Sequence, residues 1–409
     1  MKVLAYTSPS RGNLFPLVPI LSELRKRGHE IAVRTLNVGL DPLRALGFTA
    51  EPIDPRIEAI PHDDFKAKTP VGSVKRSTAV FLRRAEFEVD DLRAAIAAES
   101  PAVLIVDINC WGAVAVAEMS GLPWATVLPY PAPFPGGGIP PFGPGFAPAR
   151  DFAGRLRDRL LAPVIVGSVE RAIKPVLNAV RTKVGASPVA DLREAFSTAP
   201  LTLYLTAEPL EYRRTDWPAS YRLVGPLSFD PPAETPEWLD EIDRPIVLVT
   251  TSSEFQDDGK LIAAALDGLR DEDVFVVATL PSGDPSTFDV PVNARVERWL
   301  PHSVVLPRAA CVITHGGMGA TQKALAAGIP VVAVPFGRDQ HEVARRVEVS
   351  GAGVRLPSSK VTPARLRDAV RQARTKHAAA QHLAGELATA GGAPRAAEEI
   401  EALTGSQLP

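Results

Sequence analysis

A glycine-rich turn carries the most informative chemistry in the sequence. His315 is followed by Gly316-Gly317-Met318-Gly319-Ala320, between an apolar run that ends at Thr314 and a segment with helical periodicity. Glycines let a backbone approach a ligand closely, and the N-terminus of a helix offers free N–H groups at the positive end of its dipole. The turn therefore suits a diphosphate, although a tight strand–helix turn without a ligand has the same appearance.

Three further loops supply groups that match a nucleotide sugar. Ser252 and Ser253 follow an apolar run, and their hydroxyls could bind a phosphate or cap the next helix. The indole of Trp299 could stack on a nucleobase or belong to the core. Asp339 and Gln340 combine a carboxylate with an amide, which suits the hydroxyls of a sugar.

Apolar runs that alternate with amphipathic segments must position these loops. The alternation occurs once in each half of the chain and predicts an α/β fold with two parallel sheets, each covered by helices on both faces. Ligands of such sheets bind beyond the carboxyl ends of the strands, so two facing domains would form one cleft. We expect four regions: an N-terminal acceptor domain at 1–215, a linker at 216–240, a C-terminal nucleotide-sugar domain at 241–385, and a C-terminal helix at 386–409 that packs back on the first domain.

Composition limits the class of protein. The 409 residues suffice for two or three domains, and 45 Lys+Arg against 47 Asp+Glu leave no electrostatic signature of nucleic-acid or anionic-membrane binding. The two cysteines, Cys110 and Cys311, stand alone in apolar runs, which argues against a disulfide framework and favours the cytoplasm. Asp107 and Asn109 interrupt the best apolar run, which is shorter than the ~20 residues of a membrane helix.

A segment rich in proline and glycine spans residues 129–144. Its composition excludes a helix or an interior strand. Tyr130, Phe134 and Phe142 within it would suit a hydrophobic ligand, so we interpret the segment as a loop over the cleft.

These motifs together resemble a known family. The second half is similar to the donor signature of family 1 glycosyltransferases, through the run Trp299…Pro301-His302…His315-Gly316-Gly317-Met318-Gly319…Pro330…Pro335…Asp339-Gln340. The N-terminal part resembles the opening of the same family at Ser10-Arg11-Gly12-Asn13. The resemblance implies the GT-B fold, in which two Rossmann-like domains face each other across a cleft. It also implies inverting transfer without a metal or cofactor, and is strongest to the actinobacterial branch that modifies antibiotics and other natural products.

Site residues follow from the resemblance position by position. Trp299 would stack on uracil or thymine while the backbone of Leu300 reads the base. The diphosphate would bind His315, Gly317, Met318, Gly319 and Ala320, with Ser252 and Ser253 opposite. Asp339 and Gln340 would bind the sugar. The acceptor would lie against Gly12, Asn13, Phe15, Trp111, Tyr130, Phe134 and Phe142.

Two positions depart from the family pattern. Asn13 stands where the family has its general base, a histidine, although Asp107 matches the acidic partner of that base; an amide cannot accept a proton. Asp107 itself, His62, or an acidic acceptor that needs little help could compensate. Lys323 stands where the family has a glutamate for the two ribose hydroxyls, which makes a dTDP-sugar credible, while Asp339 and Gln340 favour UDP-glucose.

The sequence therefore predicts an inverting glycosyltransferase that moves a hexose to a hydrophobic polyketide, macrolide, ansamycin or phenolic acceptor. The alternatives are a C-glycosyltransferase and an accessory protein that binds nucleotide without transfer. A nucleotide-sugar epimerase is disfavoured by the aromatic loop, and a dinucleotide-dependent oxidoreductase by the single glycine in the first loop. We expect small-molecule partners, no nucleic acid or membrane, and a monomer or homodimer.

Overall fold

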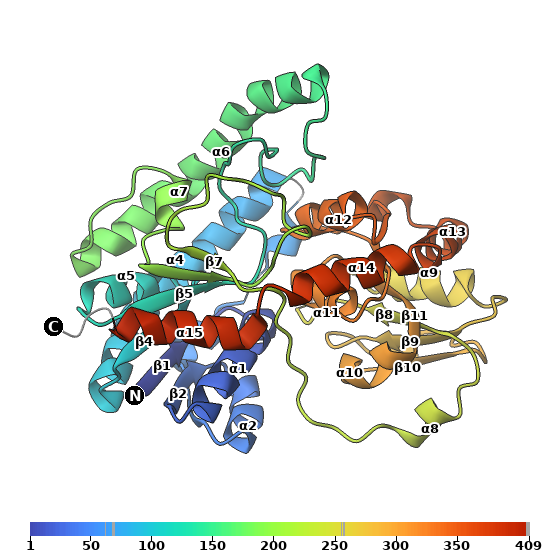
Figure 1. Ribbon diagram of the computed structural model, residues 1–409, viewed down its shortest axis with the longest axis horizontal. Coiled ribbons are helices and arrows are strands. Elements are labelled where there is room, and N and C mark those ends of the chain that lie inside the picture. The colour runs from blue at the N-terminus through green and yellow to red at the C-terminus, as the bar shows by residue number, and fades with distance from the viewer. Residues whose placement is uncertain (62, 68–69, 255, 257, 406–409) are drawn as a thin grey trace.

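Two parallel sheets form the protein, one in each half of the chain (Figure 1). The computed structural model describes residues 1–61, 63–67, 70–254, 256 and 258–405. The first sheet has seven strands in the order β3-β2-β1-β4-β5-β6-β7, and the second has six in the order β10-β9-β8-β11-β12-β13. This arrangement confirms the α/β architecture expected from the alternating runs.

The strands are short and mostly buried. The first sheet comprises β1 (Lys2–Tyr6), β2 (Glu30–Thr35), β3 (Thr49–Pro52), β4 (Val103–Asp107), β5 (Trp124–Leu128), β6 (Leu201–Tyr204) and β7 (Tyr221–Leu223). The second comprises β8 (Ile246–Thr250), β9 (Phe275–Thr279), β10 (Ala294–Glu297), β11 (Ala309–Thr314), β12 (Val331–Ala333) and β13 (Gly353–Arg355).

Helices cover both faces of each sheet. The first half contains α1 (Arg11–Lys26), α2 (Asn37–Ala45), α3 (Pro55–Glu58), α4 (Pro70–Glu99), α5 (Trp111–Met119), α6 (Phe152–Val184) and α7 (Leu192–Ala195). The rest of the chain contains α8 (Glu237–Asp240), α9 (Lys260–Gly268), α10 (His302–Val305), α11 (Met318–Ala326), α12 (Gln340–Val349), α13 (Pro363–Arg374), α14 (His377–Ala388) and α15 (Gly392–Gly405).

Both sheets reverse their strand order at one place. In the first sheet β1 lies between β2 and β4, and in the second β8 lies between β9 and β11. At such a point the connections that follow the two neighbouring strands run to opposite sides of the sheet. A crevice therefore opens at the carboxyl ends of these strands. The loops after β1, β4, β8 and β11 therefore form the natural binding positions, one pair in each domain.

Helix α1 begins earlier than its apolar spacing suggests. The clear apolar spacing begins at Leu17, but the helix starts at Arg11 and includes Pro16 and Pro19. Proline has no N–H to donate to the carbonyl four residues earlier, so the carbonyls of Gly12 and Phe15 are left without these helical partners. The early start places Asn13 in the first helical turn.

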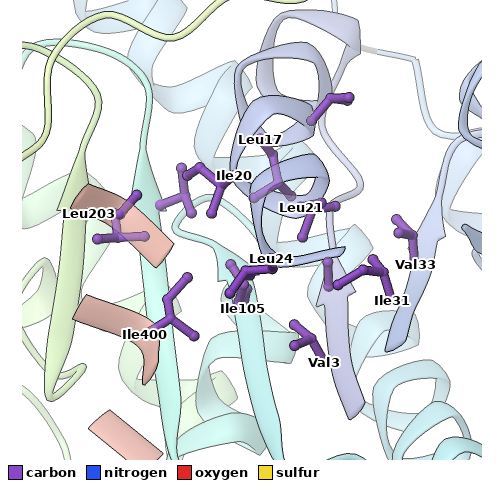
Figure 2. Packing of buried hydrophobic residues seen from close by; sticks show 14 of the residues in the cluster. Val3, Leu17, Ile20, Leu21, Leu24, Ile31, Val33, Ile105, Leu203 and Ile400 are labelled. Atoms are coloured by element: carbon purple, nitrogen blue, oxygen red, sulfur yellow. The ribbon is translucent and has the colours of Figure 1, made fainter. Parts of the chain in front are cut away.

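The C-terminal helix α15 packs on the first domain. It contacts α1, and its residues Ala396, Ala397 and Ile400 are buried in one cluster with the apolar side of α1. Figure 2 shows Ile400 beside Leu203 and near Ile20 and Leu24. His29 and Arg27 bind Glu401 at 2.8 and 2.9 Å, so polar contacts flank the apolar ones.

Strand β7 extends the first sheet past the expected boundary at residue 215. Its three residues, Tyr221 to Leu223, pair with β6 in parallel. A strand this short has too few residues for a recognisable alternation, so the sequence assigned it to the linker. Within the described ranges, no helix has both the length and the apolar character of a membrane span.

Candidate active site

Asn13 and Asp107 meet where the first sheet reverses its strand order. Asp107 ends β4 and is 2% exposed. The side chain of Asn13 donates a hydrogen bond to its carboxylate. The backbone N–H of Asn109 donates to Oδ1 at 2.8 Å, and the Thr7 hydroxyl donates weakly to Oδ2 at 3.4 Å. The acidic group predicted as a partner of the base thus lies directly beside the residue that replaces that base.

Burial controls the protonation of Asp107. Loss of solvation raises the pKa of its carboxyl to about 6, although the hydrogen bonds from Asn109, Asn13 and Thr7 act in the opposite direction. A carboxylate with this pKa is mostly ionised at neutral pH and is a stronger base than an ordinary aspartate. The local environment therefore suits proton acceptance near pH 7.

A second buried carboxyl, Glu88, supports the same loop. Its oxygens accept hydrogen bonds from the Ser8 hydroxyl at 2.7 Å and from the backbone N–H of Gly112 at 3.0 Å, and burial raises its pKa to about 7. Arg84 donates to the carbonyls of Pro9 and Ile60 at 3.2 and 2.7 Å. The sequence analysis missed this network, because Arg84 and Glu88 lie four residues apart and resemble an ordinary exposed helical ion pair.

Tyr130 is linked to Asp107 through Asn109. Its hydroxyl donates to Oδ1 of Asn109 at 2.7 Å. Burial raises the pKa of this phenol well above its usual value, and the negative charges of Asp107 and Asp339 raise it further.

His315 and Gly317 shape the start of α11. His315 is 8% exposed, and burial lowers the pKa of its ring. Its Nδ1 atom is buried without a hydrogen-bond partner among the described residues. A Cβ on Gly317 would lie 2.3 Å from Nε2 of His315, so a larger residue there must displace the ring or the turn. The result is a compact turn with a free polar atom and unpaired helical N–H groups, as a diphosphate site requires.

The loop after β8 is preorganised. The backbone N–H of Ser252 donates to Asp258 at 2.7 Å, and the Ser252 hydroxyl accepts from the backbone of Glu254 at 3.2 Å. The Ser282 hydroxyl donates to the carbonyl of Ser253 at 2.7 Å. Ser252 is buried and Ser253 is exposed, so the two serines predicted to bind phosphate present different surfaces.

The residues predicted to bind the base and the ribose differ in their surroundings. Trp299 is 43% exposed, which leaves an indole face for a ligand, whereas Leu300 is buried. Lys323 of α11 forms an ion pair with Asp230, and Asp230 also accepts from the backbone N–H of Ser303 at 2.8 Å. The charge of Lys323 is therefore balanced by a carboxylate from the segment between the domains.

Asp339 and Gln340 have unequal roles in the structure. Asp339 precedes α12 without capping it, and burial raises the pKa of its carboxyl to about 6. Gln340 is 2% exposed; its Oε1 accepts from the N–H groups of Phe336 and Gly337 at 2.8 and 3.0 Å, and its Nε2 donates to Gln256 at 2.8 Å. The carboxylate of Asp339 therefore remains available for a sugar hydroxyl, whereas the side-chain amide of Gln340 is engaged in hydrogen bonds that stabilise the loop.

The predicted acceptor residues separate into two groups. Phe134 is 1% exposed within an aromatic cluster, and Trp111 is 6% exposed and packs on Phe81 at 5.3 Å between ring centroids. Tyr130 and Phe142 are half-buried, Gly12 is exposed, and Phe15 packs edge-on against Phe229. Tyr130 and Phe142 are thus more available to an acceptor than Phe134 and Trp111. His62 lies outside the described residues.

Two parallel sheets that each reverse their strand order once form the GT-B arrangement, and comparisons with known proteins identify the family. Residues 263–403 match the family model for the C-terminal domain of erythromycin biosynthesis protein CIII-like proteins. The chain is 34% identical to 4'-demethylrebeccamycin synthase from Lentzea aerocolonigenes over 386 residues, 90% of this chain and 91% of the relative.

Solved structures have the same fold. The glycotransferase of kitacinnamycin superposes with a TM-score of 0.75 at 24% identity, covering 98% of both chains. The calicheamicin glycosyltransferase CalG4 gives 0.73 at 22%, covering 100% of this chain and 99% of the other. The protein belongs to the family 1 glycosyltransferases of natural-product biosynthesis. Among the residues that the structure covers, no cluster of three or more His, Cys, Asp or Glu side chains could hold a metal ion.

Proposed function

We propose that this glycosyltransferase moves a hexose from a nucleoside diphosphate sugar to an acidic hydroxyl of a hydrophobic acceptor and forms a β-glycoside. The buried carboxyl of Asp107, with a pKa of about 6, carries this proposal. It stands at the reversal point of the first sheet, which is where an acceptor nucleophile must approach the sugar held by the second domain. UDP-glucose is the proposed donor, and a dTDP-sugar is the main competitor.

The donor side supports departure of the diphosphate. The N-terminus of α11 would stabilise the negative charge that develops on the leaving group, and the neutral ring of His315 would donate a hydrogen bond to it. The indole of Trp299 offers a surface for the base, and Asp339 offers a carboxylate for the sugar hydroxyls. In this proposal no metal ion takes part.

The chemical step is a single in-line displacement. The acceptor oxygen forms a bond to the anomeric carbon while the bond from that carbon to the phosphate oxygen breaks, and its electron pair leaves with the diphosphate. The acceptor proton passes to Asp107, directly or through a water molecule. Because Asp107 is 2% exposed and Asn13 binds it from one side, a phenol-type hydroxyl, which needs less assistance than an aliphatic alcohol, fits this site best.

Sugar transfer assays test the proposal. Purified protein is incubated with UDP-glucose or dTDP-glucose and with matched phenolic and aliphatic acceptors, and mass spectrometry detects the gain of one hexose. We expect transfer to phenols and a β-anomeric proton coupling in the product. A sugar that resists acid hydrolysis would instead indicate a C-glycoside. Nucleotide binding without transfer to any acceptor would support the accessory function that Asn13 leaves open.

A further inference from the structure

The proline- and glycine-rich segment of the first domain docks on helix α12 of the second. The backbone N–H groups of Gly143 and Gly145 both donate to Oε1 of Glu342, at 2.8 and 2.9 Å. The guanidinium of Arg345 donates to the carbonyl of Gly145 at 2.8 Å. Three hydrogen bonds therefore fix one short stretch of loop backbone to one helix across the domain boundary.

The contact is too close for a side chain at its centre. Gly145 has a φ of +64°, and a Cβ added there would lie 2.3 Å from the backbone oxygen of His341. Glycine is the residue that permits both the left-handed conformation and the close approach. The loop thus lies directly on the backbone of α12.

Glu342 is buried and bound on both oxygens. It is 2% exposed, and its Oε2 accepts from Arg346 at 3.0 Å. Arg346 is itself buried and also donates to Glu211 of the first domain at 2.8 Å. The charge that holds the loop is therefore balanced inside the interface rather than by solvent.

The two ends of the segment are tied to the two halves of the site. Near its start, Tyr130 donates to Asn109, whose backbone N–H in turn binds Asp107. At its far end, the segment meets Glu342 on the helix that begins immediately after Asp339. The backbone between Tyr130 and Gly143 consequently spans from the carboxylate of the first domain to the donor helix of the second.

We propose that Glu342 is a positioning residue that fixes the proline- and glycine-rich segment, together with the two residues that follow it (129–146), against the donor domain, so that nucleotide binding orders the wall of the acceptor site. The assignment of the segment as an acceptor wall rests on the proposed function; the docking contact does not. A ligand that stabilises the start of α12 also stabilises the surface on which the loop lies, and the coupling must act in both directions.

Hydrogen exchange on the full chain tests this proposal without an acceptor. In the wild type, saturating UDP or dTDP should slow amide exchange in peptides that cover residues 136–146. In Glu342→Ala, exchange in these peptides should be at least ~10-fold faster because the charged acceptor of two N–H groups is lost, and nucleotide should no longer slow it. Nucleotide affinity by calorimetry should fall in this variant by no more than the factor by which nucleotide slows exchange in the wild type, because the coupling is reciprocal and Glu342 does not touch the proposed donor groups.

A pair of glycine variants provides the control. Gly145→Ala should reproduce the faster exchange, because its Cβ meets the backbone of α12. Gly138→Ala lies in the same segment at a similar φ of +78° with nothing within 4 Å of the added Cβ, and should leave exchange near Gly145 unchanged. This pair separates loss of the contact from the general strain of alanine at positive φ.

Unchanged exchange in Glu342→Ala would overturn the proposal, as would a loss of nucleotide affinity larger than the factor by which nucleotide slows exchange in the wild type. The proposal would also be overturned if bound nucleotide did not slow amide exchange in the wild-type peptides that cover residues 136–146. Once an acceptor is known, its KM should rise ~10-fold in Glu342→Ala with kcat nearly unchanged, whereas a merely misfolded variant would lose both. Absence of sugar transfer together with nucleotide-dependent protection would refute the proposed function and leave the docking inference standing.

Discussion

The side-chain amide of Asn13 donates a hydrogen bond to the carboxylate of Asp107, and the hydroxyl of Ser10 donates to Oδ1 of the same Asn13 at 2.9 Å. These two contacts fix the orientation of the amide, with its oxygen toward Ser10 and its nitrogen toward Asp107. Asn13 therefore orients the carboxylate but cannot accept a proton itself. Basicity at this site must come from Asp107 or from the acceptor.

Replacement of Asp107 should impair catalysis more than binding. Asp107→Asn keeps the size of the side chain and removes its basicity, so we expect kcat to fall ~10²–10⁴-fold with an aliphatic acceptor and much less with a phenol. Nucleotide affinity, measured by calorimetry, should stay within ~2-fold of the wild type. Asp91→Asn, which also alters a hydrogen-bonded carboxylate of the first domain, is the matched control. Equal losses with both acceptor types would argue against Asp107 as the base.

The pH dependence of kcat/KM should reveal the same carboxyl. The pKa of Asp107 is raised to about 6, and its ionised form is the base. Activity should therefore be constant above pH ~7 and should fall ~10-fold per pH unit well below pH ~6, as the carboxyl becomes protonated. The pKa of Asp339 is also about 6, so the Asp107→Asn variant must be measured in parallel. An acidic limb that persists in this variant would belong to Asp339.

Two glycines of the diphosphate turn should respond differently to alanine. Gly317→Ala brings a Cβ to 2.3 Å from Nε2 of His315 and must displace the ring or the turn, so UDP affinity should fall at least ~10-fold. Gly319→Ala meets nothing within 4 Å and lies inside α11, where alanine is favoured by ~1 kcal/mol. Calorimetric titration of both variants with UDP checks this contrast. Similar affinities would place the diphosphate elsewhere.

The sequence predicted the parts of the site that depend on local pattern. The loop after β11 was recognised because glycines, a histidine and a helix start are contiguous in the chain. Asp107, at the end of an apolar run, was recognised through the family resemblance, as the match to the acidic partner of the family's base. The two sheets followed from the alternation of such runs, which requires no knowledge of long-range contacts.

Contacts between segments distant in sequence could not be predicted in this way. The ion pair of Lys323 with Asp230 and the docking of Gly145 on α12 depend on how the two domains face each other. The same holds for Phe134, which looked suited to a ligand but packs at 5.6 Å from the ring of Tyr221 in an aromatic cluster. An aromatic residue in a proline-rich loop gives no local signal that distinguishes these environments.

The ion pair between Lys323 and Asp230 should influence nucleotide choice. Lys323→Glu alone sets two carboxylates against each other and should weaken binding of UDP and dTDP alike. Adding Asp230→Asn removes the repulsion and leaves a glutamate able to accept from both ribose hydroxyls. The double variant should then raise the ratio of UDP to dTDP affinity ~10-fold over the wild type, because the deoxyribose lacks one hydroxyl. A ratio that does not change would remove Lys323 from the ribose site.

Arg346 should be the most sensitive residue of the domain interface. It is 4% exposed and lies between Glu211 and Glu342, which are 1% and 2% exposed. Arg346→Met fits the space but leaves two buried carboxylates without a cation, and removing one partner of a buried ion pair costs about 3–5 kcal/mol. Arg371→Met breaks the contact with Glu272 on the surface, where Arg371 is 60% exposed, and should cost at most ~1 kcal/mol. Chemical denaturation of both variants measures the difference.

Because the Arg346 network joins the two domains, Arg346→Met should also let the two domains unfold in separate transitions. A single transition, with a loss of stability below ~1 kcal/mol, would show that the buried charges do not hold the interface together.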